Sequence, residues 1–141
     1  MAGWLNRLLG DRLLGDRHLG NRGERRAAKF LRRKGYKILA RQCTSRLGEI
    51  DLIALEGETI VFVEVKTRRS DSAGLPSEAV TPAKQKKLTS LALVYLKRHG
   101  LLEHRARFDV VTVLWPAEGK QPEIEHYQNA FEPVGFGQMY S

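Results

Sequence analysis

Three charged residues inside a short apolar block are the clearest sign of chemistry in this sequence. Asp51 interrupts one apolar run, and Glu64 and Lys66 follow in the next. A carboxylate among buried apolar residues is costly unless it is paired or holds a cation. Two acids and one lysine that converge on one patch could bind a hard divalent cation and position a water molecule beside it. These residue types therefore suggest metal-assisted attack by water.

The block is typical of a β-hairpin, with strands over residues 48–55 and 59–68 and a turn around Gly57. The second strand is apolar at both parities, which is expected of a strand covered on both faces. Because side chains alternate along a strand, Glu64 and Lys66 share one face, roughly 6.6 Å apart.

The length of the turn decides on which face Asp51 lies. A two-residue loop, Glu56-Gly57 or Gly57-Glu58, places Asp51 on the face of Glu64, and the second choice sets the two acids directly opposite each other. A three-residue loop without a bulge would turn Asp51 to the far face.

A solvated ion network across the two strands is the competing interpretation of these charges. Ile60 and Phe62 share the face of Glu64 and argue against full solvation. Glu49 lies at the same parity as Asp51, and it is either a supporting carboxylate or a solvated charge at the strand end.

Positive charge is concentrated ahead of these acids. Residues 1–48 contain 13 Lys and Arg against 3 Asp and Glu, whereas residues 49–141 contain 11 against 13. A basic surface around an acidic patch suits a phosphodiester substrate that is held by cations. A merely soluble basic surface would show the same charge excess.

Composition excludes several other classes of protein. The chain has 141 residues, a net charge of +8 and one cysteine, Cys43, so neither a disulfide framework nor a cysteine zinc site is expected. No apolar stretch approaches the roughly 20 residues that span a bilayer, and no signal peptide is recognisable. We therefore expect a cytoplasmic protein with no membrane association.

The pattern predicts an α/β fold in which a mixed sheet lies between helices. Capping signals start helices at Asn21-Glu24 and at Thr81-Pro82. The expected order is a helix over 21–34, strands over 36–44, 48–55 and 59–68, a loop over 70–77, a helix over 81–98, and strands over 107–115 and 123–127. Residues 1–20 form a flexible basic arm or a frayed amphipathic helix, residues 21–131 form one domain, and residues 132–141 form a tail.

At this point the sequence resembles the PD-(D/E)xK nuclease superfamily, in which an Asp on one strand precedes an E-x-K motif on the next. A longer match is similar to the YraN-like family of small bacterial predicted endonucleases. It consists of Gly23-Glu24-x-x-Ala27-x-x-x-Leu31, Gly48-Glu49-Ile50-Asp51-Leu52-Ile53-Ala54, Val61-Phe62-Val63-Glu64-Val65-Lys66-Thr67-Arg68, Lys84-Gln85, Arg107-Phe108-Asp109-Val110-Val111 and Asn129-Ala130-Phe131. The resemblance implies a restriction-endonuclease-like three-layer sandwich related to Holliday-junction resolvases.

The resemblance also implies roles for single residues. Asp51, Glu64 and the backbone carbonyl of Val65 would hold Mg²⁺ or Mn²⁺, and Lys66 would orient or deprotonate the attacking water or stabilise charge on the phosphate. Glu24 would add a carboxylate, unless it serves only as a helix cap, and Gln85 would assist the site, unless it lies on a solvated helix face. The expected phosphate contacts are Arg25, Arg26, Arg32, Arg33 and Arg68.

The leading hypothesis is a metal-dependent endonuclease that hydrolyses phosphodiester bonds in structured or damaged DNA. The alternatives are a non-catalytic nucleic-acid-binding module with the same fold, and a nuclease directed at RNA. The sequence leaves the choice between monomer and homodimer open.

Overall fold

The computed structural model describes residues 22–69, 80–116 and 121–134. The arm predicted over 1–20, the loop predicted over 70–77 and most of the predicted tail lie outside these ranges. Within them, no helix is long and apolar enough to cross a membrane.

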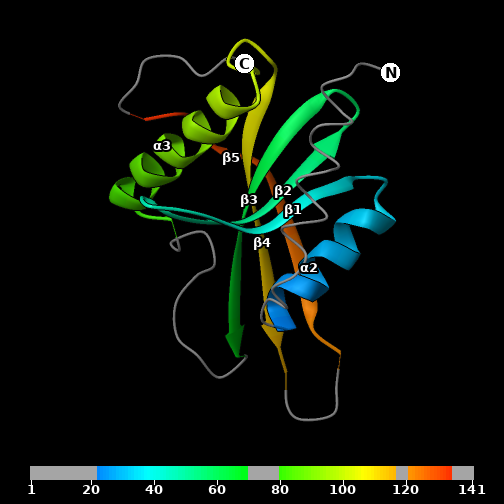
Figure 1. The fold of residues 1–141 in the computed structure, drawn as a ribbon. Helices are drawn as coiled ribbons and strands as arrows, with labels where there is room; N and C mark the ends of the chain where they lie inside the picture. Colours follow the sequence, from blue (N-terminus) through cyan, green and yellow to red (C-terminus); the bar gives the residue numbers. More distant parts are fainter. Residues whose placement is uncertain (1–21, 70–79, 117–120, 135–141) are drawn as a thin grey trace.

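The described residues form two helices and one five-stranded sheet (Figure 1). The elements are α2 (Arg22–Arg33), β1 (Lys37–Ser45), β2 (Gly48–Glu56), β3 (Thr59–Arg69), α3 (Pro82–Arg98), β4 (Ala106–Trp115) and β5 (Glu123–Phe131). The strands lie in the order β1-β2-β3-β4-β5. Only β3 and β4 are parallel, and they are the pair joined through α3, whereas the other neighbours are antiparallel.

The two helices pack on opposite faces of the sheet, which makes three layers (Figure 1). Successive side chains of β3 point to opposite faces of the sheet, and each face carries its own apolar cluster. Val61 and Val63 pack with Leu31 of α2, while Ile60 and Phe62 pack with residues of α3. The predicted α/β class is therefore confirmed, and the mixed sheet between two helices fits a restriction-endonuclease-like sandwich.

The hairpin of β2 and β3 closes with the shorter of the loops considered. Glu56 pairs with Thr59 and Leu52 pairs with Val63, so Gly57-Glu58 is the two-residue loop. Gly57 has a φ of 60°, which is the left-handed conformation that a turn with glycine at its first central position requires. Regular pairing stops one residue short of Asp51 and Glu64, and the two acids are in contact through their side chains.

α3 begins where its capping residues predict, whereas β5 is longer than predicted. Thr81 caps α3 by accepting a hydrogen bond from the Lys84 amide at 3.2 Å, and Pro82 takes the first helical position, as predicted. β5 continues to Phe131, four residues beyond the predicted end at 127. It contains an irregularity opposite Asp109, where Asn129 has a φ of 50°.

Candidate metal centre

The acids meet where the ladder between β2 and β3 opens. Regular pairing of these strands ends at Leu52 and Val63. Beyond that point the Val65 amide donates to Asp51 Oδ2 at 2.8 Å. The Asp51 carboxylate thus takes the place of a backbone carbonyl of β2 as the acceptor for this amide, and β3 holds the side chain in position.

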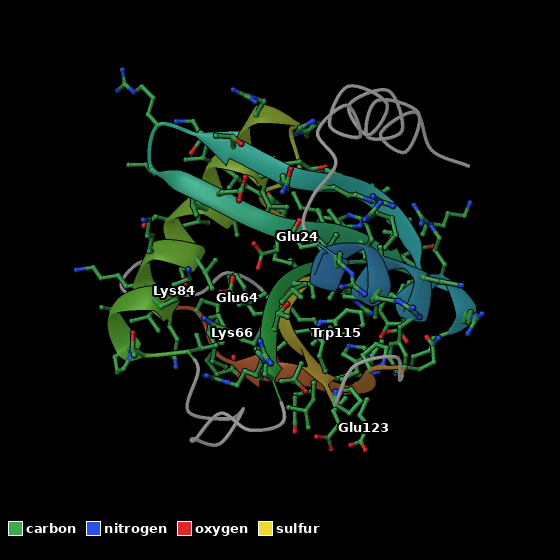
Figure 2. The ribbon with its side chains drawn as sticks, turned by 90° about the horizontal axis from the view of Figure 1, so that it is seen from below. Glu24, Glu64, Lys66, Lys84, Trp115 and Glu123 are labelled. Atoms are coloured by element: carbon green, nitrogen blue, oxygen red, sulfur yellow. The ribbon has the colours of Figure 1, made fainter. Side chains whose placement is uncertain are left out.

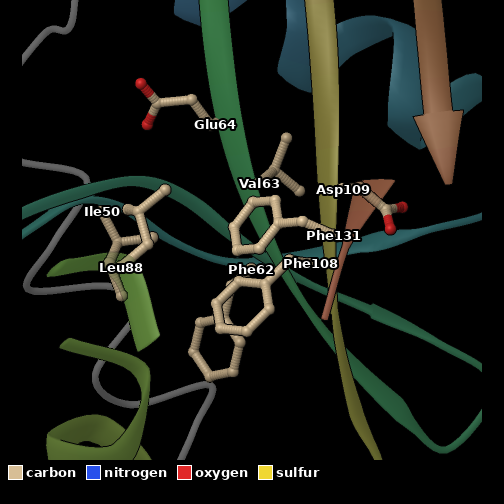
Figure 3. A pocket seen from close by; sticks show the side chains of 8 residues that line it. All are labelled: Ile50, Phe62, Val63, Glu64, Leu88, Phe108, Asp109 and Phe131. Carbon is tan, nitrogen blue, oxygen red and sulfur yellow. The ribbon is translucent and has the colours of Figure 1, made fainter. Parts of the chain in front are cut away.

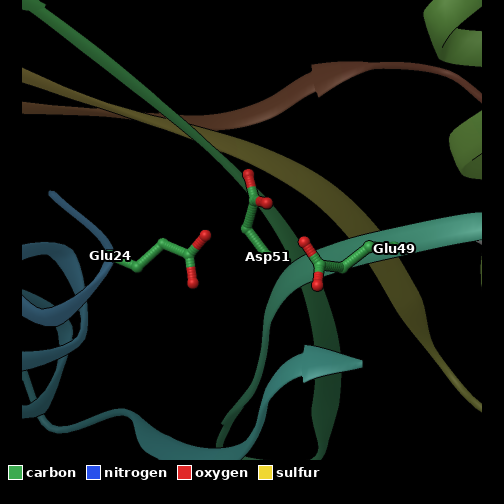
Figure 4. A group of neighbouring side chains, drawn as sticks. All are labelled: Glu24, Glu49 and Asp51. Carbon is green, nitrogen blue, oxygen red and sulfur yellow. The ribbon is translucent and has the colours of Figure 1, made fainter. Parts of the chain in front are cut away.

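Glu24, Glu49 and Asp51 point toward one another, as Figure 4 shows. One carboxylate oxygen from each residue lies within 4.8 Å of the other two. Glu24 comes from the first turn of α2 and is only 4% exposed, while Glu49 and Asp51 come from β2. Glu24 and Glu49 thus both belong to the acidic cluster, Glu49 from an exposed position at the strand end. Asn21, the partner in the predicted capping box, lies outside the described residues.

Glu64 stands beside this cluster with two lysines on one of its oxygens. Lys66 Nζ lies 3.3 Å and Lys84 Nζ lies 3.4 Å from Glu64 Oε2. The Glu64 side chain is buried, and it points away from the apolar side chains of Ile50, Leu88 and Phe108 (Figure 3). Figure 2 shows Glu64 between Glu24 of α2 and Lys84 of α3.

Burial and neighbouring carboxylates raise the pKa values of Asp51 and Glu24. Burial and the hydrogen-bonded Glu64 carboxylate raise the pKa of Asp51 to about 8, although the Val65 amide lowers it, and Glu24 raises it further. Burial and Glu49 raise the pKa of Glu24 to about 7, against the opposing effects of Arg41 and a hydrogen bond from Gln42. Burial and mutual repulsion of these carboxylates therefore favour a bound proton at Asp51 and Glu24.

The donor set fits a hard divalent cation. All its ligand atoms are carboxylate oxygens, which Mg²⁺ and Mn²⁺ prefer. Asp51 belongs both to the predicted pair with Glu64 and to the triplet with Glu24 and Glu49. The acidic residues of this cluster could therefore hold a metal ion.

Two neighbouring residues of α3, Lys84 and Gln85, have different surroundings. The Gln85 amide donates to the Val80 carbonyl at 3.1 Å and lines a separate cavity, and no contact in the described structure joins it to the acids. Lys84, its neighbour, contacts Glu64 instead. Only the adjacency of Lys84 and Gln85 pointed to this helix turn, and the sequence could not say which of the two faces the sheet.

The predicted phosphate contacts on α2 lie on its outer surface. Arg25 and Arg26, together with Arg22 and Lys29, line a cavity of about 360 Å³. The Arg22 guanidinium lies 4.4 Å from the centre of the Trp115 ring, a contact that orients a cation without neutralising it. Arg32 and Arg33 are exposed near the end of the helix, and Arg68 is half-buried on β3.

The model of a family described as uncharacterised protein family UPF0102 matches residues 23–113. The chain belongs to this family. It is 50% identical to a UPF0102 protein of Geobacter sulfurreducens over 113 residues, which cover 79% of this chain and 86% of the relative. It is 49% identical to a UPF0102 protein of Rhodopirellula baltica over 122 residues, which cover 84% and 73%. All four acids and both lysines of the site lie inside the UPF0102 match, whereas the whole of β5 lies outside it.

Replacing Asp51 by asparagine should stabilise the metal-free protein at pH 8. The pKa of Asp51 is raised to about 8 in the folded state, so folding favours its protonated form. The stability it contributes is present below pH 4 or so and is lost as the pH rises through the folded pKa. Partial exposure reduces the effect, and we expect Asp51→Asn to gain about 2–3 kcal/mol at pH 8 and nothing near pH 4.

Thermal unfolding at both pH values, with and without Mg²⁺, measures this effect. Mg²⁺ should raise the Tm of the wild type and leave that of Asp51→Asn unchanged, because the variant lacks one ligand charge. Glu123→Gln, a substitution of an exposed acid on β5, is the matched control and should behave like the wild type. An equal Mg²⁺ response in Asp51→Asn would rule out this metal centre.

Proposed function

We propose that this UPF0102 protein is a metal-dependent endonuclease that hydrolyses phosphodiester bonds in structured or damaged DNA. The observation that carries the proposal is the meeting of Asp51 and Glu64 with Lys66 at the open end of the hairpin. The resemblance to the YraN-like family and to the PD-(D/E)xK nucleases supports it, because the same three residues stand at that family's motif positions.

Asp51, Glu64 and the Val65 carbonyl would hold Mg²⁺ or Mn²⁺, with Glu24 and Glu49 as further oxygen donors. A divalent cation at such a site lowers the pKa of water and offsets charge on a phosphate. The Val65 amide fixes the Asp51 carboxylate at 2.8 Å, so this ligand is oriented by the backbone. Together, Glu24 of α2, Glu49 and Asp51 of β2, and Glu64 of β3 lie close to one another without a bound ligand.

The lysines supply the remaining charges of the site. Lys66 lies between the acids and solvent, with its ammonium 3.3 Å from Glu64. From there it can donate hydrogen bonds to a water molecule or to a phosphate oxygen. Lys84 approaches the same carboxylate oxygen from α3 and adds a second positive charge where a phosphate would lie.

The outer surface of α2 is suited to hold the rest of a polyanion. Of the described residues, no carboxylate forms an ion pair with Arg22, Arg25, Arg26 or Lys29. Such cations bind phosphates by releasing counterions, which makes the affinity fall steeply with salt. The same helix thus carries Glu24 toward the acids and a row of cations toward solvent.

A cleavage screen of the wild-type protein tests the proposal. Substrates are duplex, flap, four-way junction and single-stranded DNA, and single-stranded RNA, each with Mg²⁺, Mn²⁺ or EDTA. We expect cleavage of a DNA substrate with either metal and none with EDTA. Binding without cleavage of any substrate would replace the nuclease by a non-catalytic nucleic-acid-binding module, and cleavage of RNA alone would replace DNA by RNA.

A further inference from the structure

A second cavity opens on the face of the sheet that carries Glu64. It has a volume of about 290 Å³ and lies between the start of α3 and strands β4 and β5. Its walls include Gln85 from the helix, Val110 from β4, and Tyr127 and Phe131 from β5. A volume near 300 Å³ is at the lower end of small-ligand pockets, about 300–1,000 Å³. The cavity therefore has room for one small planar group.

The cavity is a direct neighbour of the acidic site. Val110 pairs with Glu64 on one side and with Tyr127 on the other, so these three residues form one row across three strands. Residues in such a row point to the same face, and two steps between strands amount to about 10 Å. On the helix side, Gln85 follows Lys84, which contacts Glu64. Phe131 also lines both this cavity and the narrow gap next to Glu64 (Figure 3).

The lining groups favour a nucleobase over a phosphate. The Tyr127 ring is 36% exposed, and no aromatic ring of the described residues stacks on it. Its hydroxyl donates to Glu125 at 3.2 Å, so a carboxylate stands beside the ring and would repel a phosphate. The Gln85 amide nitrogen is held by the Val80 carbonyl at 3.1 Å, which leaves the oxygen of this amide as an acceptor for an exocyclic amino group.

We propose that this cavity binds one unstacked nucleobase of the strand whose phosphate lies at the acidic site, with Tyr127 as the stacking platform. This inference rests on the proposed function and narrows it. A base can enter the cavity only where it is not paired, so the substrate class is single-stranded or branched DNA, and fully paired duplex is disfavoured. Stacking of a base on an aromatic side chain is tolerant of sequence, so no sequence preference is expected from Tyr127.

Binding of DNA that contains 2-aminopurine tests the proposal, with Ca²⁺ in place of Mg²⁺ so that the oxygen ligands of the acidic site hold a cation. The fluorescence of this adenine analogue falls when it stacks on an aromatic ring. Wild type should bind a single strand more tightly than the same sequence in a duplex and should quench the analogue. Tyr127→Leu should weaken single-strand binding by about tenfold, as the loss of one stacked base predicts, and should abolish quenching. Tyr127→Phe should keep both, because the ring remains.

Leu102→Ala, at an exposed apolar position beyond the far end of α3, is the matched control and should bind like the wild type. Unfolding curves of each variant show that the fold is intact. If Tyr127→Leu binds and quenches like the wild type, or if duplex binds as well as single strand, the nucleobase site is wrong. Cleavage with Mg²⁺ is scored separately. If the wild type binds as described but cuts no substrate, the nuclease proposal is wrong and the nucleobase site stands. If the wild type cuts DNA and Tyr127→Leu has no effect on binding or quenching, the nucleobase site is wrong and the nuclease proposal stands.

Discussion

Replacing Lys66 by alanine should lower the rate of DNA cleavage by about 10²–10³-fold and leave the affinity for DNA nearly unchanged. The Lys66 ammonium is 3.3 Å from Glu64 Oε2, next to the position where a water and a phosphate oxygen would meet. A positive charge fixed there stabilises the negative charge that develops in the transition state. For binding, in contrast, Lys66 is one of 24 Lys and Arg in the chain. Single-turnover cleavage and filter binding across a salt series measure the two effects separately.

Lys84→Ala is the matched variant for this prediction. Lys84 touches the same oxygen of Glu64 at 3.4 Å, but it comes from the helix and is more exposed than Lys66. We expect a loss of about tenfold, because water screens an exposed charge. Lys86→Ala, an exposed change on the same helix, should have no effect. Cleavage by Lys66→Ala at the wild-type rate, or a loss of affinity as large as the loss of rate, would contradict the role given to Lys66.

Local sequence patterns were sufficient to predict the hairpin that carries the acids and the start of α3. The Gly57-Glu58 loop fixes the register of the hairpin, and the period of two along a strand then brings Asp51 near Glu64 and places Lys66 beside Glu64. Thr81 and Pro82 fix the start of α3 in the same local way. These features depend on neighbours in the chain, so the residue types alone determine them.

Local sequence patterns could not predict contacts between elements that are distant in the chain. The direction of Glu49 depends on where α2 places Glu24, and the choice between Lys84 and Gln85 depends on how α3 is rotated on the sheet. The end of β5 was missed for a related reason. Its last residues pair with β4 through an irregularity at Asn129 that a side chain on β4 holds in place.

That side chain, Asp109, is an instructive contrast to Asp51. Each aspartate accepts a hydrogen bond from a backbone amide at a break in the sheet, Asp51 from Val65 and Asp109 from Asn129. Burial raises the pKa of Asp109, but hydrogen bonds from His126, Arg107 and the Asn129 amide outweigh it, and the pKa lies below its ordinary value. Asp51 thus has carboxylate neighbours that a cation could offset, whereas Asp109 is satisfied by donors of the protein itself.

The environment of Asp109 is closed on every side. The residue is fully buried, with Arg107 Nε at 3.0 Å and His126 Nε2 at 2.7 Å from its two oxygens. Arg107 continues to Glu56 at 2.7 Å and to the Tyr36 hydroxyl at 2.8 Å. This network joins β2, β4 and β5 on the α2 side of the sheet, opposite the face of Glu64.

Asp109→Asn should therefore lower the free energy of unfolding by about 3–4 kcal/mol. The amide is nearly isosteric, but its NH₂ group faces the donors of Arg107 and His126, and removing one partner of a buried ion pair is strongly destabilising. The Tm should fall by about 10 °C, whereas Glu123→Gln should leave it unchanged. Because the folded pKa of Asp109 is depressed, its contribution is present above pH 4 or so and is lost as the pH falls. The difference between Asp109→Asn and wild type should accordingly shrink below pH 4. Mg²⁺ should still raise the Tm of Asp109→Asn, as it does for the wild type. If the variant instead has wild-type stability and Mg²⁺ no longer raises its Tm, Asp109 belongs to the metal centre.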